Sequence, residues 1–180
     1  LIMGFYAILI ASIARPLGGL FFGYIGDKYG RKISLVISLY GIALATLFIG
    51  ILPSYAQIGI SAAILLTLIR SIQLFCYGGE YSGAGIYVVE LAKSKNTAFI
   101  GALLSAMALV GSVVAAIVGI ILTNANRVDP NWRLGFILGG VVGLIAIYFR
   151  RGMTESVSKH ELVKSPSLLS ILKSQPRALF

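Results

Sequence analysis

Residues 33–52 read ISLVISLYGIALATLFIGIL, an apolar run without a charged side chain. A helix of roughly 20 such residues is long enough to cross the hydrocarbon core of a bilayer. The chain of 180 residues is 58% apolar and 12% charged, whereas an average soluble domain is about 25% charged. A soluble fold of this size could not bury so much apolar surface. The sequence therefore predicts an all-α, polytopic membrane bundle and argues against a soluble enzyme.

Further apolar stretches lie on both sides of this run. We expect five transmembrane helices in all, over residues 1–25, 33–52, 57–89, 97–122 and 132–149. Together they form a helical region over residues 1–150. Residues 151–180 turn polar and basic, and we expect a loop there with a short amphipathic piece at Leu168–Leu172. Because the chain opens at Leu1 inside an apolar stretch, we also expect a piece of a longer protein or the product of a broken reading frame.

The formal charge of +9 comes from basic residues that lie between the apolar runs. Alternate connections carry eleven Lys and Arg residues against two. Cytoplasmic loops of membrane proteins carry such an excess. The rule places residues 26–32, the connection near Lys93 and the C-terminal tail in the cytoplasm, and it accounts for the charge without nucleic acid as a partner.

One long span carries a polar stripe. Its members fall within about a third of the helix circumference, and they are Arg70, Gln73, Tyr77, Glu80 and Tyr81. Ionisable groups inside a membrane usually face a cavity or a partner. Arg70 is therefore a candidate for binding or ion coupling, or it pairs with a carboxylate inside the bundle. Glu80 is a candidate proton carrier, or one half of a permanent ion pair, for example with Arg15.

Arg15 is followed by Pro16, Gly18 and Gly19. Proline removes a helical hydrogen bond, so this place predicts a cavity lining or a hinge. A packing kink with a buried ion pair is the open alternative. Glycines one turn apart predict close helix packing, and they are Gly19 with Gly23, Gly79 with Gly83, Gly111 with Gly119 through Ala115, and Gly135 with Gly139 and Gly143.

The connection over residues 23–32 reads GYIGDKYGRK. Gly26 and Gly30 permit a tight turn, and Asp27 can cap the start of the next helix. Other chemistry is absent from the sequence. Cys76 and His160 are single residues without metal-ligand spacing, so we expect no metal, no cofactor and no enzymatic activity.

The same connection resembles the signature of the major facilitator superfamily between its second and third helices. The matching residues are Gly23, Asp27, Lys28, Gly30, Arg31 and Lys32. Two further stretches, Arg15–Gly19 and Gly78–Tyr81, are similar to the metabolite:proton symporter family, which includes proline/betaine, citrate, α-ketoglutarate and shikimate transporters. Trp132, Arg133 and Arg150 also fit that family. Leu74 and Gly135 depart from it, where glycine and proline are usual.

The resemblance implies a partial major-facilitator fold in which the five spans are helices two to six of twelve. Residues 151–180 would be the cytoplasmic central loop approaching helix seven. In the family the signature forms a cytoplasmic gate. Carried over, Asp27 faces a helix end of the other half, and Arg31 pairs with an acid near the end of helix four, for which Glu90 fits. That these charges only set the topology is the open alternative.

The resemblance also implies a proton-coupled symporter in the bacterial cytoplasmic membrane. Its solute would be a small zwitterion such as proline or betaine, or else a carboxylate. Arg15 or Arg70 would hold a substrate carboxylate, and Glu80 would exchange a proton. The expected partners are the solute, the proton, the bilayer and the other half of the carrier. One alternative is a non-autonomous or decayed half-carrier, and a second is an oligomeric channel, which the signature counts against.

Overall fold

The computed structural model describes residues 2–91, 96–124 and 132–154, with side chains for residues 12–90, 96–122 and 132–154. Every regular element within these ranges is a helix. They are α1 (Ile2–Tyr29), α2 (Arg31–Ile51), α3 (Tyr55–Ile58), α4 (Ile60–Leu91), α5 (Thr97–Asn124) and α6 (Trp132–Arg151). The predicted all-α fold is confirmed. Lys93, Lys95, Arg127 and residues 155–180 of the predicted C-terminal loop, Leu168–Leu172 included, lie outside the described residues.

Four helices, α2, α4, α5 and α6, are long and apolar enough to cross a membrane. Large apolar side chains also cover their outer surfaces, as Leu109, Val113 and Ile120 of α5 do. A helix that exposes apolar side chains all round suits a lipid environment. Helix α1 is not among the four. Its described part carries three charged residues, so the membrane span expected over residues 1–25 stays a prediction.

Helix α4 begins later than expected. The sequence predicted one span from Gln57, whereas the structure divides this stretch into α3 and α4 at Gly59. Gly59 has a φ of 58°, which favours glycine. Its amide donates to the carbonyl of Tyr55 at 2.8 Å, which closes α3. Ser54 and Gln57 form a capping box at the start of this short helix.

The connection between α1 and α2 is tighter than predicted. Only Gly30 lies outside the two helices, and it has a φ of 109°. The expectation that Asp27 caps the second helix is wrong. Asp27 lies inside the last turn of α1, and Gly30 takes the cap position of α2 without a side-chain hydrogen bond. Gly26 is also helical, so a single glycine makes the turn.

Glycine makes the closest helix contact, between α1 and α4. A Cβ at Gly18 would overlap the carbonyl oxygen of Phe75, and one at Gly78 would overlap the carbonyl oxygen of Arg15. Helix α1 runs through Pro16 without a break. Of the predicted glycine pairs, Gly79 packs against Phe22, but a Cβ at Gly23 would meet nothing within 4 Å. Spacing therefore identified the type of contact and only part of its residues.

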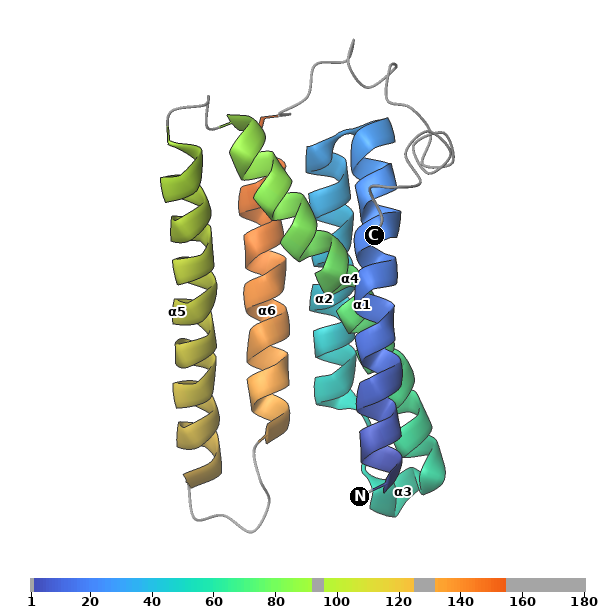
Figure 1. Cartoon of the computed structure of the whole chain (residues 1–180). Coiled ribbons are helices and arrows are strands. Elements are labelled where there is room, and N and C mark those ends of the chain that lie inside the picture. Colours follow the sequence, from blue (N-terminus) through green and yellow to red (C-terminus); the bar gives the residue numbers. More distant parts are fainter. Residues whose placement is uncertain (1, 92–95, 125–131, 155–180) are drawn as a thin grey trace.

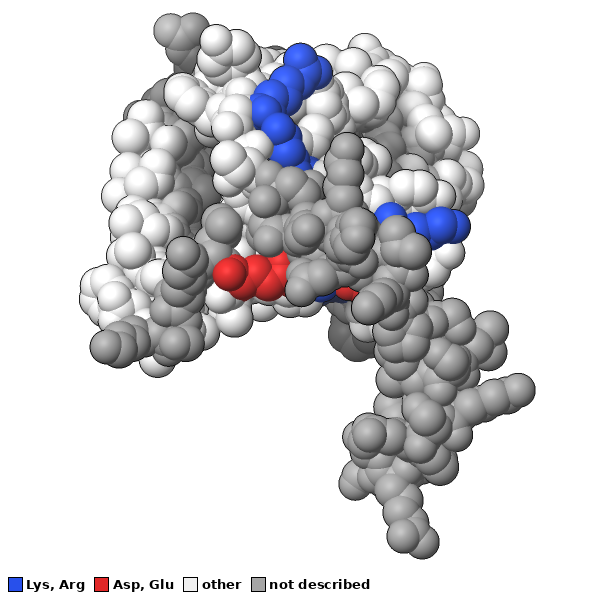
Figure 2. All heavy atoms as spheres, turned by 90° about the horizontal axis from the view of Figure 1, so that it is seen from above, with Lys and Arg blue, Asp and Glu red and all other residues white. Residues whose placement is uncertain are grey.

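Helix α4 crosses α1 and α2 obliquely, α6 lies beside α2, and α5 stands at the edge of the bundle (Figure 1). The start of α6 is tied to the end of α2, since Arg133 donates to the carbonyl of Leu52 at 3.1 Å. One end of the bundle gathers the C-terminal ends of α1, α4 and α6 and the starts of α2 and α5 (Figure 1). Basic and acidic side chains are both visible on this end (Figure 2).

Candidate functional site

Arg31 joins α1 to α4 at the charged end of the bundle. The turn at Gly30 places it at the start of α2. Its Nη2 lies 2.7 Å from Asp27 Oδ1, and its Nε donates to Glu90 Oε1 at 3.1 Å. The side chain is 14% exposed, against 46% for Asp27. A planar guanidinium suits two carboxylates at once. The contact expected between Arg31 and Glu90 is therefore present, and its role in a gate stays a proposal.

The remaining residues of this connection surround that ion pair. A Cβ at Gly26 would lie 3.1 Å from Arg31 Nη1, so glycine leaves room for the guanidinium. Lys28 is exposed and donates to Tyr24 Oη at 3.2 Å. This hydrogen bond, with a second one to Tyr29, raises the pKa of Lys28 above its usual value. Lys28 thus stays a cation at physiological pH, and Lys32 is half-buried at the start of α2.

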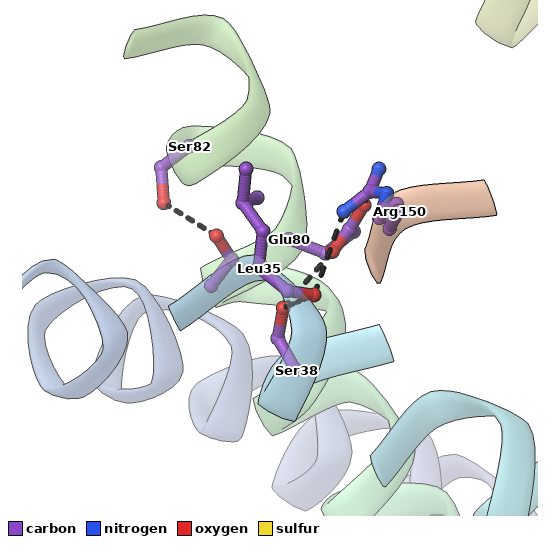
Figure 3. A network of polar contacts seen from close by, with 6 residues as sticks. Leu35, Ser38, Glu80, Ser82 and Arg150 are labelled. Carbon is purple, nitrogen blue, oxygen red and sulfur yellow. Dashed lines mark hydrogen bonds and ion pairs between the residues drawn. The ribbon is translucent and has the colours of Figure 1, made fainter. Parts of the chain in front are cut away.

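Glu80 lies in a polar network between α2, α4 and α6 (Figure 3). Arg150 of α6 forms an ion pair with Glu80 Oε1. Ser38 of α2, which is fully buried, donates to Glu80 Oε2 at 2.9 Å. Both carboxylate oxygens therefore have partners. The pair considered between Glu80 and Arg15 is not the one observed, because Arg150 reaches Glu80 from the last turn of α6 and Arg15 lies against other residues.

Arg70 and Gln73 form a second neighbourhood on α4. Arg70 Nη1 donates to Gln73 Oε1 at 2.6 Å, and Gln73 Nε2 donates to Thr46 Oγ1 of α2 at 2.6 Å. The Arg70 guanidinium also lies 5.9 Å from the ring centroid of Phe136 in α6. Arg70 is exposed, while Gln73 is half-buried. Gln73 therefore orients Arg70 and ties it to α2.

Arg15 meets two tyrosines of α4. Its guanidinium lies 4.8 Å from the ring centroid of Tyr77 and 5.5 Å from that of Tyr81. All three side chains are exposed on the bundle surface. Such an arrangement is a cation–π contact. We call Arg15, Arg70, Tyr77 and Tyr81 the exposed polar face of the bundle.

The predicted stripe on α4 thus divides into two sides. Gln73 and Glu80 turn to α2, while Arg70, Tyr77 and Tyr81 stay exposed. This follows from helix geometry, because Gln73 and Glu80 are offset from the others by roughly 40° to 100° at 100° per residue. The exposed polar face therefore presents two arginines and two tyrosines on the surface of an apolar bundle. In a membrane, such charged groups need water or a polar partner.

A cavity of about 790 Å³ lies between α5 and α6 and borders the neighbourhood of Arg70 and Gln73, because Thr46 and Phe136 also line it. Its lining is almost wholly apolar and includes Val114, Val118, Phe136 and Leu138. None of the predicted site residues lines it. Among the described residues, no group of three or more His, Cys, Asp or Glu side chains could hold a metal ion.

The comparison with known families agrees with the signature at Arg31. A family model described as Major Facilitator Superfamily matches residues 2–180. The chain belongs to the major facilitator superfamily. With its apolar helices, it is an integral membrane protein, and its fold is a partial major-facilitator bundle.

Three relatives within the superfamily carry related names. A protein of Staphylococcus haemolyticus (strain JCSC1435), provisionally named a proline/betaine transporter, is 41% identical over 170 residues, 92% of this chain and 36% of the relative. One of Staphylococcus aureus (strain COL) with the same provisional name is 42% identical over 167 residues, which are 90% of this chain and 36% of the relative. The proline/betaine transporter of Escherichia coli (strain K12) is 40% identical over 151 residues, which are 82% of this chain and 30% of the relative. The chain thus spans about a third of these relatives.

Sequence reasoning missed three residues that support this major-facilitator site. Ser38 and Thr46 hold Glu80 and Gln73, and Arg150, noted only as a match to the family, is the partner of Glu80. A signal was available for Arg150. An acid inside a membrane bundle needs a cation, and Arg150 ends an apolar span. The sequence gives no comparable indication for Ser38 and Thr46, because isolated serine and threonine residues are common in membrane helices.

Proposed function

We propose that this chain is part of a proton-coupled secondary symporter for a small zwitterion, a solute of the proline or betaine type. The exposed polar face carries this proposal. Arg15 and Arg70 offer guanidinium groups to a carboxylate. Tyr77 and Tyr81 offer ring faces to a quaternary or secondary ammonium. The names of the relatives support the same solute class. A simple carboxylate is the second candidate.

The proposed orientation has the Arg31 end of the bundle in the cytoplasm of a bacterial cell. Basic residues dominate the connections predicted at this end. The ion pairs of Arg31 with Asp27 and Glu90 would then act as a cytoplasmic gate. Asp27 is 46% exposed, which leaves it accessible to a helix end from the rest of the carrier. Proteins of this family move solutes, so we propose no enzymatic activity and no cofactor.

Uptake into membrane vesicles that contain the chain together with the remaining helices of a relative tests the function. We expect labelled proline or glycine betaine to accumulate when the pH outside is lower than inside, and to stop accumulating when a protonophore removes the gradient. A panel with α-ketoglutarate separates zwitterion from carboxylate transport. Arg70→Gln should abolish uptake, while Arg151→Gln serves as the matched control. Uptake that ignores the pH gradient, or that survives Arg70→Gln unchanged, contradicts the proposal.

Glu80 is the proposed proton carrier, and its ion pair with Arg150 would link proton binding to the packing of α4 against α6. A proton on Glu80 would remove the partner of Arg150, so proton exchange would be linked to the contact between α4 and α6. The alternative is a permanent ion pair. If Glu80 carries the proton, Glu80→Gln should make the remaining uptake independent of the pH gradient. If the pair is permanent, Glu80→Gln should lower uptake without removing its dependence on the gradient, and the double variant Glu80→Gln/Arg150→Gln should restore part of the uptake because no uncompensated charge remains.

A second proposal concerns whether this chain can transport a solute without further helices. The chain spans about a third of its relatives, and substrate sites of such carriers lie between repeats near the bilayer midplane. We therefore propose that these helices supply one side of the site, as a half-carrier that needs further helices. Uptake by membranes with the 180-residue chain alone would contradict this. Uptake only after co-expression with the second half of a relative would support it.

A further inference from the structure

Tyr87 of α4 has a contact that the proposed transport site does not use. Its side chain is 4% exposed, and its hydroxyl donates to the backbone carbonyl of Thr154 at 2.7 Å. Thr154 lies three residues beyond the end of α6. A phenylalanine would fill the same space, so the hydroxyl adds only this hydrogen bond. A buried hydroxyl without a partner would be costly.

The contact is the second of two along one side of α4. Tyr87 follows Glu80 by seven residues, which is close to two helical turns. Thr154 follows Arg150 by four. The ion pair of Glu80 with Arg150 and the hydrogen bond of Tyr87 with Thr154 therefore join the same two segments at successive points. We call these two contacts the α4–α6 clasp.

The backbone at the end of α6 is shaped to reach Tyr87. The amide of Gly152 donates to the carbonyl of Phe149 at 3.2 Å, and the amide of Met153 donates to the carbonyl of Arg150 at 3.1 Å. These two turns follow the end of the helix at Arg151. Among the described residues, the carbonyl of Thr154 is the acceptor beyond α6 to which α4 donates a hydrogen bond.

Helix α2 holds the same end from the other side. Arg150 Nη1 donates to the carbonyl of Leu35 at 3.5 Å, and Arg151 forms a hydrogen bond with Tyr40. The last turn of α6 is thus fixed by side chains, while the backbone beyond it is fixed by Tyr87. Among the described contacts, the Tyr87 hydroxyl is the one that links α4 to the chain after α6.

We propose that Tyr87 is a positioning residue for transport. Its hydrogen bond makes the backbone at Thr154 move together with α4. This rests on the proposed function, because α4 also carries Arg70, Tyr77 and Tyr81 of the exposed polar face. A shift of α4 on solute binding would pass through the clasp to the last turn of α6 and to the backbone at Thr154. Tyr87 touches neither solute nor proton in this scheme.

The test uses one reporter and two readouts, each in its own membrane preparation. The reporter is Met153→Cys in a Cys76→Ala background, because position 153 is half-buried and precedes the residue whose carbonyl Tyr87 binds. Tyr87→Phe removes only the hydroxyl. The matched control is Tyr148→Phe, since Tyr148 is 76% exposed on α6. The first readout is the rate of maleimide labelling at position 153 in permeabilised membranes. The second is the Vmax and KM of proline or glycine betaine uptake without the reporter, in sealed vesicles that also contain the remaining helices of a relative.

We expect Tyr87→Phe to raise the labelling rate about three- to tenfold, which corresponds to the loss of one net hydrogen bond. We also expect Vmax to fall by a similar factor while KM stays unchanged. Tyr148→Phe should change neither readout. Glu80→Gln with the same reporter removes the other point of the clasp and should also raise the labelling rate.

Unchanged labelling in both Tyr87→Phe and Glu80→Gln overturns the clasp. Faster labelling with unchanged Vmax shows that Tyr87 holds the chain without positioning anything for transport, and this also overturns the inference. A fall in protein amount that accounts for the whole loss of Vmax does so as well. If the unmodified chain together with the remaining helices of a relative takes up no solute at all, the proposed function has failed, whereas the labelling rates still decide whether the clasp exists.

Discussion

At the scale of single residues, three arginines of the described bundle have side-chain partners of matching chemistry. Arg31 holds two carboxylates, Arg150 pairs with Glu80, and Arg70 is oriented by Gln73. Removal of one member of a partly buried pair leaves an uncompensated charge. These residues therefore act in groups, and variants of one member report on the whole group.

Gly30 allows the first of these groups to form, and its substitution is a residue-scale test. Its φ of 109° and ψ of 146° belong to a region that only glycine adopts readily. Gly30→Ala should lower the free energy of unfolding by roughly 1–3 kcal/mol, since such strain costs about that much. Thermal unfolding in detergent measures it.

Gly26→Ala is the control for that measurement. Gly26 is helical, and a Cβ there would meet mainly the flexible side chain of Arg31. We expect this variant to unfold closer to the unmodified protein than Gly30→Ala. Equal stabilities for the two variants would show that the backbone conformation at Gly30 is not required.

At the scale of elements, the contact of α1 with α4 is the closest in the described bundle. Gly78→Ala would place a methyl group on the carbonyl oxygen of Arg15, and backbone cannot move aside as a side chain can. Overpacking of this kind costs roughly 1–3 kcal/mol. We expect the helices to separate and the unfolding temperature in detergent to fall.

Gly85→Ala on the same helix should have the opposite sign. A Cβ at Gly85 would meet nothing within 4 Å. In the middle of a helix, alanine is more stabilising than glycine by roughly 0.5–1 kcal/mol. A higher unfolding temperature for Gly85→Ala together with a lower one for Gly78→Ala identifies packing as the cause. The account of the crossing is wrong if both variants shift in the same direction.

Much of the fold could be predicted at this scale because hydropathy alone identifies helices long enough to cross a membrane. The break at Gly59 could not, since one glycine in a long apolar run is equally compatible with a continuous helix. The sequence indicates that Glu80 needs a cationic partner, but it does not decide between Arg15 and Arg150. The choice depends on which face of α6 meets α4, and the sequence of a single helix does not encode its neighbours. The contact of Arg31 with Glu90 was predictable through the family signature.

At the scale of the whole molecule, the ends of the helices divide the bundle into two sides. Lys28 is exposed at one end and Tyr55 of α3 is exposed at the other (Figure 1). In a Cys76→Ala background, Tyr55→Cys should react with a membrane-impermeant maleimide in intact cells. Lys28→Cys should react only after permeabilisation, because the basic end stays in the cytoplasm. The reverse pattern would invert the proposed orientation.

The central claim is that the exposed polar face of α4 and α1 binds the solute. Leu74 lies between Arg70 and Tyr77 on this face at helical spacing and is half-exposed. Leu138→Cys, on the wall of the apolar cavity, is the control. The deciding measurement is the alkylation rate of Leu74→Cys with and without glycine betaine in membranes that take up this solute. The account predicts about tenfold protection at roughly ten times the Kd and none at Leu138→Cys. Equal rates at Leu74→Cys with and without solute would contradict it.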